Sequence, residues 1–281
     1  MTEVYQIVTD RILAALARGV VPWRKPWNGS ANVPTNIVSR KPYRGSNRIL
    51  LDPSIHGYTS CYWMTYRQAQ GLGGQVRKGA KSSVAVLWRF VQDRKDPKRR
   101  IPFLRYFNVF NLEQVDGIQA PEQNPIAFNP IERAEQIANG WQGAPRMLEN
   151  GGDRCFYTPS TDTISMAQRC TFRTVEAWYA TLYHEMVHAT GHTSRLDRLK
   201  PGREEYAREE LVAELGASFL CAEAGIGNEL ADNSAAYIAG WMQALQADPK
   251  AIVVASGAAE RAADLILGRT KPTDDGDDGD E

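Results

Sequence analysis

Residues 182–192 read LYHEMVHATGH and contain three of the four histidines of the 281-residue chain. The nonpolar residues around these histidines predict a buried helix. His184 and His188 are four residues apart, so on a helix their side chains lie on one face, one turn apart. Two imidazoles at this spacing can bind the same metal ion, and Glu185 between them can reach a water at that ion. The stretch therefore predicts a helix built around a metal site.

The H-E-x-x-H pattern on a helix is the signature of zincin metallopeptidases, in which the histidines hold the metal and the glutamate is the general base. The alternative is a pair of core histidines bonded to carboxylates. Metzincins place a third histidine six residues after the second, whereas His192 follows His188 by only four. We therefore do not assign His192 as a ligand, and expect it to contact substrate or to cap the helix end.

A later predicted helix, at about 204–224, supplies candidates for the third ligand. Glu210 and Glu214 lie one turn apart, on a face with small alanines that allow a close approach to the histidine helix. As in thermolysin-like enzymes, Glu210 would bind the metal and Glu214 would orient a ligating histidine; the reverse order is the alternative. Three other acids are expected on the solvated face: Glu204, Glu205 and Glu209.

The expected metal is one divalent ion. Two imidazoles and one carboxylate favour Zn2+. Mn2+ or another divalent ion is the alternative, because availability and geometry decide metal selectivity. The predicted strand at 163–166, which contains Ser165, would align an extended peptide beside the metal by strand addition. Candidates for stabilising the oxyanion are Tyr157, His192 and Tyr206.

The net charge of zero hides two halves of opposite charge. Residues 1–118 contain 19 Lys and Arg against 7 Asp and Glu, and the remainder contains 14 against 26. This asymmetry indicates that the basic half binds a polyanion. The last eight residues read DDGDDGDE, and residues 269–281 are predicted to be a disordered acidic tail because they cannot bury nonpolar surface.

The proline-rich stretch QAPEQNPIAFNP (119–130) has no helical period and predicts a linker. The chain is therefore predicted to be an α+β protein of two domains. The first, at 1–118, is a mixed α/β DNA-binding domain with an amphipathic helix at 2–18 and strands at 82–91 and 101–112. The second, at 131–268, is a mainly helical zincin-like domain with a small sheet. Its predicted elements are a strand pair at 155–166 and helices at about 131–140, 173–190, 204–224, 230–246 and 249–267.

The cysteines and the N-terminus indicate in which cellular compartment the protein is expected. The four cysteines form no C-x-x-C pair, which argues against a zinc ribbon and a disulfide framework and fits a reducing cytosol. The N-terminus has no uninterrupted nonpolar run, so we expect neither a signal peptide nor a membrane span. The expected location is the cytoplasm.

Aromatic residues alternate with Arg, Lys, Gly and Asn throughout the basic half, as in VPWRKPWNGS and KPYRGSNRILL. Single-stranded nucleic acid needs both kinds of residue, because bases stack on rings and phosphates contact cations. A single tryptophan is better explained as a core residue than as a stacking surface. The prediction of nucleic-acid binding therefore depends on the combined pattern of rings and cations. The stacking candidates are Trp23, Trp27, Tyr43, Trp63 and Tyr66. The phosphate-binding candidates are Arg24, Lys25, Lys41, Arg44, Arg48, Arg77, Lys78 and Lys81.

Several ordered motifs together resemble ArdC-type antirestriction proteins. PWRKPWNG, KPYRGSN, GGQVRKGAKS and VFNLEQVDG resemble their N-terminal domain, which is also similar to the N-terminus of TraC-type plasmid primases. HEMVHATGHTSRLDR and EELVAELGASFL resemble the zincin-like metallopeptidase domain that follows it. The resemblance covers roughly residues 1–268.

The resemblance implies a protein of mobile elements that binds single-stranded DNA and protects incoming DNA from host restriction. It also implies His184, His188 and a carboxylate of EELVAE as metal ligands, with Glu185 as the base. Two alternatives stay open. One is a metallopeptidase guided by DNA to cleave a DNA-bound host protein, and the other is a DNA-coating protein whose metal is only structural.

Overall fold

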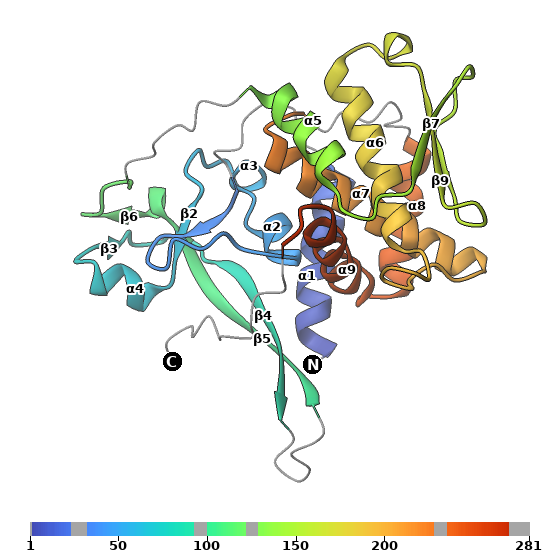
Figure 1. Ribbon diagram of the computed structural model, residues 1–281. Coiled ribbons are helices and arrows are strands. Elements are labelled where there is room, and N and C mark those ends of the chain that lie inside the picture. The colour runs from blue at the N-terminus through green and yellow to red at the C-terminus, as the bar shows by residue number, and fades with distance from the viewer. Residues whose placement is uncertain (1, 24–32, 93–99, 122–128, 228–234, 270–281) are drawn as a thin grey trace.

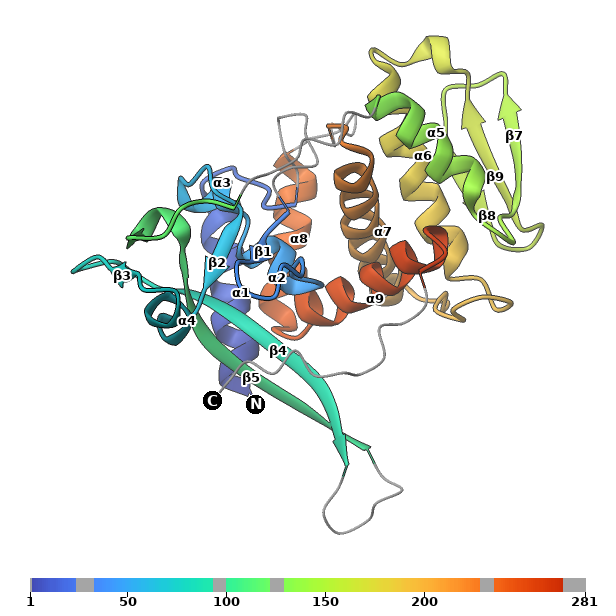
Figure 2. The same ribbon diagram turned by 60° about the vertical axis from the view of Figure 1, so that its left-hand side comes forward.

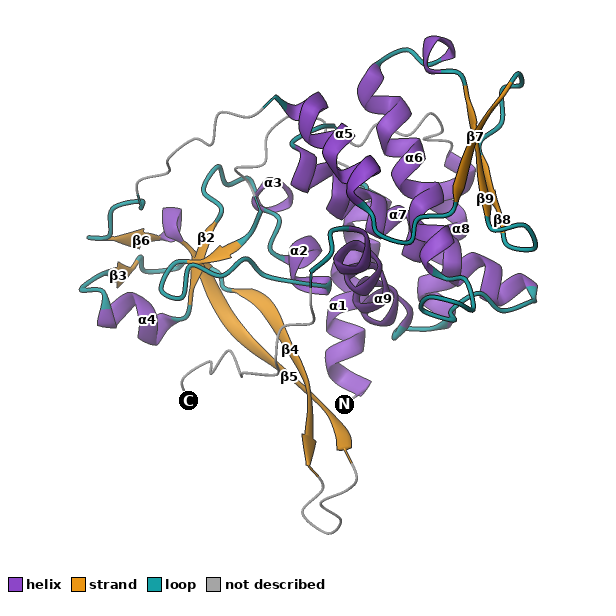
Figure 3. Cartoon of the chain, in the orientation of Figure 1, coloured by secondary structure: helices purple, strands orange, loops and turns teal. Residues whose placement is uncertain are grey.

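The computed structural model describes residues 2–23, 33–92, 100–121, 129–227 and 235–269 (Figures 1 and 3). The predicted α+β class is confirmed. The helices are α1 (Thr2–Ala17), α2 (Ser46–Leu50), α3 (Pro53–His56), α4 (Tyr66–Gly71), α5 (Pro130–Gly140), α6 (Val175–Thr190), α7 (Arg203–Ala224), α8 (Ala235–Ala247) and α9 (Ala251–Ile266). The strands are β1 (Thr35–Asn36), β2 (Tyr62–Met64), β3 (Gln75–Val76), β4 (Ser83–Gln92), β5 (Arg100–Asn111), β6 (Val115–Asp116), β7 (Arg146–Asn150), β8 (Phe156–Thr158) and β9 (Thr163–Ala167).

The basic half is organised around a long hairpin. β4 and β5 pair antiparallel from Ser83↔Val109 to Gln92↔Arg100, and the sheet order is β1-β2-β5-β4. The far end of this hairpin stands away from the rest of the chain in both views (Figures 1 and 2). A second, two-stranded sheet joins β3 to β6 beside α4. The loop at 93–99 lies outside the described residues.

The second half is a helical bundle with one small sheet on its side. α6 packs against α7, and α9 contacts both helices. The sheet order is β7-β9-β8, with β9 parallel to β7 and antiparallel to β8. The strand pair expected at 155–166 is present as β8 and β9, whereas β7 was not predicted.

The position of β9 in this sheet contradicts one prediction. Ser165 lies opposite Leu148 on one side and Phe156 on the other, so both edges of β9 already carry a partner strand. A peptide therefore has no free edge of β9 to join. Among the strands that the structure describes, β7 and β8 form the two edges of this sheet.

One hydrophobic core runs through both halves of the chain. It includes Val8 and Ile12 of α1 together with Leu215 of α7 and Ile252 of α9. α1 packs against α8 and α9 (Figure 2), and the Thr9 hydroxyl donates a hydrogen bond to the Pro249 carbonyl at 2.8 Å. The predicted linker lies mostly outside the described residues, and the boundaries at 118 and 131 stay a prediction.

The four cysteines are free thiols, as the absence of paired spacing suggested. Within the described residues, every helix is too short or too polar to cross a bilayer. Nearly all of the acidic tail, from residue 270, lies outside the described part of the chain.

Candidate metal centre and nucleic-acid surface

Helix α6 holds the histidines in a well-anchored position. The Thr174 hydroxyl caps its start by accepting a hydrogen bond from the Ala177 amide at 3.1 Å. The Trp178 indole donates to the Ala167 carbonyl at 3.1 Å and so fixes the helix to β9. The Tyr183 hydroxyl donates to the Ala134 carbonyl of α5 at 3.0 Å. α6 is thus tied to the sheet on one side and to α5 on another.

Three side chains from α6 and α7 converge on one point. The Nε2 atoms of His184 and His188 lie 3.0 Å apart. Glu210 places one carboxylate oxygen 3.5 Å from His184 Nε2 and the other 3.5 Å from His188 Nε2. In the described part of the chain, these three residues form the group whose ligand atoms could hold a metal ion.

The donor set fits a divalent cation. Two imidazole nitrogens that face each other at 3.0 Å repel unless a proton or a cation lies between them. A carboxylate facing both nitrogens favours the cation, and two nitrogens with one carboxylate are ordinary zinc ligands. The structure therefore brings together His184, His188 and Glu210 as predicted, and Glu214 lies outside the group.

Glu209 was missed as a site residue. It was expected on the solvated face, but it is only 9% exposed, so that prediction is wrong. Its carboxylate lies 3.2 Å from His188 Nδ1, which leaves Nε2 of this ring turned toward Glu210. Glu209 thus occupies the supporting position that was expected for Glu214. By contrast, His184 Nδ1 is buried and has no hydrogen-bond partner among the described residues.

Arg198 holds Glu209 in place with both ends of its guanidinium. Its Nε donates to Glu209 Oε2 at 2.7 Å, and its Nη2 donates to Oε1 at 2.8 Å. The same guanidinium donates to the Val187 carbonyl at 2.7 Å and to the Thr190 hydroxyl at 3.1 Å. Arg198 therefore links the end of α6 to the start of α7. An arginine in the loop between the two helices was the one signal in the sequence for this role.

These contacts shift the pKa values of the site. Burial lowers the pKa of His188, but hydrogen bonds to Glu209 and Glu210 outweigh burial and raise it to about 10. Burial raises the pKa of Glu210, and the two histidines more than offset this, so the net shift is downward. Burial likewise opposes ionisation of Glu209, whose pKa is lowered by Arg198 and His188. Without metal, the site thus holds an ionised carboxylate pair and a protonated His188.

Glu185 follows His184 directly in α6 and is buried. It is 7% exposed, and its charge contributes to the raised pKa of His188. The pKa of Cys155, just before β8, is raised by burial and also by the charge of Glu185. Glu185 is therefore near both the histidine pair and the start of the edge strand β8. The role of Glu185 as the general base stays a prediction.

The three oxyanion candidates have different surroundings. The Tyr157 hydroxyl donates to Asp162 at 2.7 Å and accepts from Arg195, so it is committed to an internal network. His192 is paired through Nδ1 with the Ser194 hydroxyl at 2.7 Å. Tyr206 is 66% exposed. The roles of these three residues at the oxyanion stay predictions.

Several predicted DNA contacts are core residues instead. Trp23 is 2% exposed and meets Trp241 edge-on, with ring centroids 5.2 Å apart. Trp63 is fully buried against His56. Tyr43 is 8% exposed. A base needs an open ring face for stacking, so the stacking predictions for Trp23, Tyr43 and Trp63 are wrong.

Two predicted phosphate contacts bind acids of the other half. Arg48 lies 3.5 Å from Glu223 and 3.7 Å from Glu260, and its side chain is 8% exposed. Arg44 pairs with Asp264 and lies 3.2 Å from Glu260. Burial excludes Arg48 from phosphate contact, which corrects that prediction. The charge of the half-exposed Arg44 is likewise paired with acids of α9.

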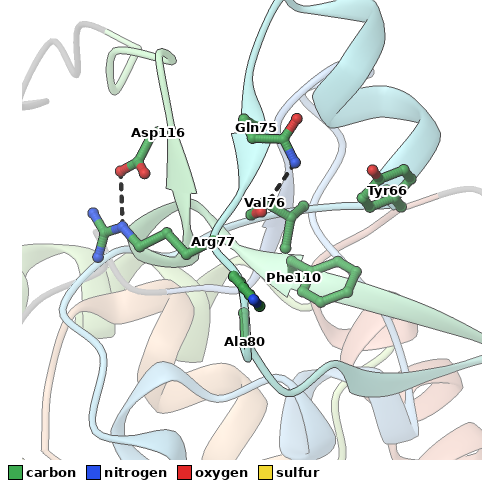
Figure 4. A pocket seen from close by; sticks show the side chains of 8 residues that line it. Tyr66, Gln75, Val76, Arg77, Ala80, Phe110 and Asp116 are labelled. Carbon is green, nitrogen blue, oxygen red and sulfur yellow. Dashed lines mark hydrogen bonds and ion pairs between the residues drawn. The ribbon is translucent and has the colours of Figure 1, made fainter.

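The remaining candidates lie at the surface or outside the described residues. Tyr66, Lys41, Arg77, Lys78 and Lys81 are exposed. Tyr66, Arg77 and Lys78 line a common pocket, shown in Figure 4. Its other lining residues were not predicted: Gln75, Val76, Ala80, Phe110 and Asp116. Outside the described residues lie Arg24, Lys25 and Trp27.

Comparison with known families and sequences divides the chain in two. Residues 2–110 match the N-terminal domain of the anti-restriction factor ArdC, and residues 132–258 match a zincin-like metallopeptidase. Protein y4eC of Sinorhizobium fredii is 38% identical, over 94% of this chain and 92% of its own length. The DNA primase TraC of Escherichia coli is 37% identical over 94% of this chain, which spans only 20% of the primase.

Solved structures cover nearly the whole chain. The Mn(II)-bound antirestriction protein ArdC of plasmid R388 is 39% identical, with a TM-score of 0.77 over 94% of this chain and 97% of that protein. Its metal-free form gives 38% identity and a TM-score of 0.76. With this identity over nearly the full length of both proteins, and with both domains matched in order, the chain belongs to the ArdC antirestriction family.

Proposed function

We propose that this protein binds one divalent metal ion through His184, His188 and Glu210, binds single-stranded DNA on its basic half, and protects incoming DNA of a mobile element from host restriction. The convergence of the three ligand atoms beside buried Glu185 carries the metal part of the proposal. The similarity to ArdC of plasmid R388 supports the antirestriction part. The charge excess of residues 1–118 supports DNA binding.

The arrangement fits hydrolysis of a peptide bond. A divalent ion held there supplies Lewis-acid chemistry toward a carbonyl oxygen and a water. Glu185 would take a proton from the attacking water and return it to the leaving amine. Glu209, held by Arg198, keeps the His188 ring oriented with Nε2 toward the other ligands. A DNA-bound host protein is the substrate that best joins the two halves.

Two observations favour different metals for this site. The two imidazoles and one carboxylate suit Zn2+. The related ArdC of plasmid R388 has a structure with Mn(II) bound, which supports Mn2+ as the second candidate. Elemental analysis of the purified protein distinguishes them. A protein with both His184→Ala and His188→Ala that retains a full equivalent of metal contradicts the proposed site.

Glu185→Gln separates hydrolysis from binding. We expect the variant to keep its metal and its affinity for single-stranded DNA, and to lose peptide hydrolysis and protection against restriction. Glu176→Gln, in the first turn of the same helix, is the matched control and should behave as the unaltered protein. If Glu185→Gln protects DNA fully, protection does not depend on peptide hydrolysis. If the unaltered protein fails to bind single-stranded DNA at low salt, the DNA part of the proposal falls.

A further inference from the structure

The pocket on the basic half is far from the metal centre. It has a volume of about 530 Å3 and lies among α4, β3, β5 and β6, on the opposite side of the chain from α6 (Figures 1 and 4). The turn that follows β3 closes one wall. Its size falls within the usual range for small-molecule sites.

Two aromatic side chains form one wall of the pocket. Tyr66 is 47% exposed and is the first residue of α4. Thr65 and Gln68 form a capping box that fixes the start of this helix. Phe110 meets the Tyr66 ring at 65° with centroids 6.5 Å apart, and its backbone is held in the β2–β5 ladder opposite Met64. Tyr66 therefore offers a positioned ring with exposed surface.

The opposite wall is polar and carries a positive excess. Arg77 Nε donates to Asp116 Oδ1 at 2.7 Å across the β3–β6 pair, so these two charges offset each other. Lys78 follows Arg77 and is exposed at the turn, and Lys81 lies three residues further on. The Gln75 amide and the Asp116 carboxylate add hydrogen-bonding groups (Figure 4). The pocket thus combines an open ring, an exposed cation and groups that can bond a base edge.

We propose that this pocket is a base-binding site: one unpaired base stacks on Tyr66, and Lys78 contacts a phosphate next to it. Base stacking on aromatic rings tolerates any sequence, because every base has a π-face. A duplex cannot use the site, since its bases are already stacked. The inference rests on the proposed binding of single-stranded DNA and specifies where a base is held. An acidic peptide is the competing occupant, because it would need the cations but not the ring.

The test uses the full-length protein and oligothymidylate that carries a single fluorescent adenine analogue. Tyr66→Leu removes the ring, and Lys78→Gln removes the cation. Tyr106→Leu is the control for an equally exposed ring, since Tyr106 is 43% exposed and lies outside the pocket. Lys200→Gln, in the other half, controls for the loss of one exposed positive charge. Far-ultraviolet circular dichroism establishes that each variant is folded.

We expect Tyr66→Leu to weaken binding roughly 5- to 150-fold and to abolish the fluorescence change of the stacked analogue. Lys78→Gln should lower the slope of log affinity against log salt by about 0.7, the value for one phosphate on a single strand. Both control variants should bind as the unaltered protein does.

Three results overturn the proposal. If the unaltered protein does not bind the oligonucleotide, both the base pocket and the proposed DNA binding are refuted. If it binds and Tyr66→Leu has no larger effect than Tyr106→Leu, the pocket alone is refuted. The same holds if a glutamate-rich peptide binds the protein through Lys78 while both pocket variants retain full affinity for DNA.

Discussion

Replacing Gly216 by alanine should push apart the two helices that form the metal centre. Gly216 lies in α7, where a Cβ atom would come within 2.7 and 2.9 Å of the two Val187 methyl groups and 3.4 Å from Val187 Cβ. Val187 is the residue before His188 in α6 and is fully buried. A β-branched side chain on a helix has one favoured rotamer, so Val187 cannot turn away. The helix axes must separate instead.

Two opposing effects set the size of the change. Overpacking a closely packed core costs about 1–3 kcal/mol. Alanine is favoured over glycine in a helix by about 1 kcal/mol, which offsets part of that cost. Gly240→Ala in α8 is the matched control, because its Cβ would meet nothing within 4 Å and it gains the helix preference alone. The difference between the two variants in free energy of unfolding should therefore be about 1–3 kcal/mol.

Urea unfolding of the metal-free protein measures this difference, and a chelator competition assay then measures metal affinity. We expect Gly216→Ala to unfold at lower urea than Gly240→Ala and to bind metal more weakly, because Glu209 and Glu210 move with α7. Gly240→Ala should bind metal normally. Equal stability of the two variants would show that the helices have room for a methyl group, and the reasoning about the close contact would then be wrong.

Two further predictions concern the surroundings of His188. Glu209→Gln should weaken metal binding about 10- to 100-fold, measured by chelator competition with Glu205→Gln as control, and an unchanged affinity would contradict the positioning role of Glu209. The pKa of His188 in the metal-free protein is raised to about 10, so its stabilising contribution is complete below its unfolded pKa of about 6.5 and is lost as pH rises through 10. The urea midpoint measured in chelator should therefore fall as pH rises from about 6.5 to about 10. Metal affinity should rise over the same pH range, because the ion displaces the proton of His188. A urea midpoint and a metal affinity that do not change with pH would refute both expectations.

The pairing of His184 with His188 was predictable because it rests on local helix geometry. The i, i+4 spacing of His184 and His188 holds for any helix, whatever its neighbours. Glu209 was not predictable in the same way, because its role depends on how α7 is rotated about its own axis. Adjacent helix residues point about 100° apart, and here both Glu209 and Glu210 flank the line of contact with α6. Each reaches a different nitrogen of His188, which the sequence pattern alone could not distinguish.

The fold was predicted best where hydrophobic periodicity is long. The strands expected at 82–91 and 101–112 correspond to β4 and β5 within a residue, and α6 and α7 lie close to their expected ranges. β7 was missed because Arg146–Asn150 is mostly exposed and so lacks the alternation that marks a half-buried strand. Trp63 was misassigned for a related reason: it lies in the three-residue strand β2, too short for any period to show which way its ring points.

The shared core changes the meaning of the charge asymmetry between the two halves. Part of the positive excess of residues 1–118 is used internally, since Arg44 and Arg48 face Glu223, Glu260 and Asp264 of the second half. These arginines stabilise the packing of the basic half on α7 and α9, where an unpaired buried acid would be costly. The charge that DNA can reach is therefore smaller than the count from the sequence, and the salt dependence of DNA binding should reflect the exposed cations alone. Because α7 carries Glu209 and Glu210 near its start and Glu223 near its end, the same helix that completes the metal centre also anchors the basic half.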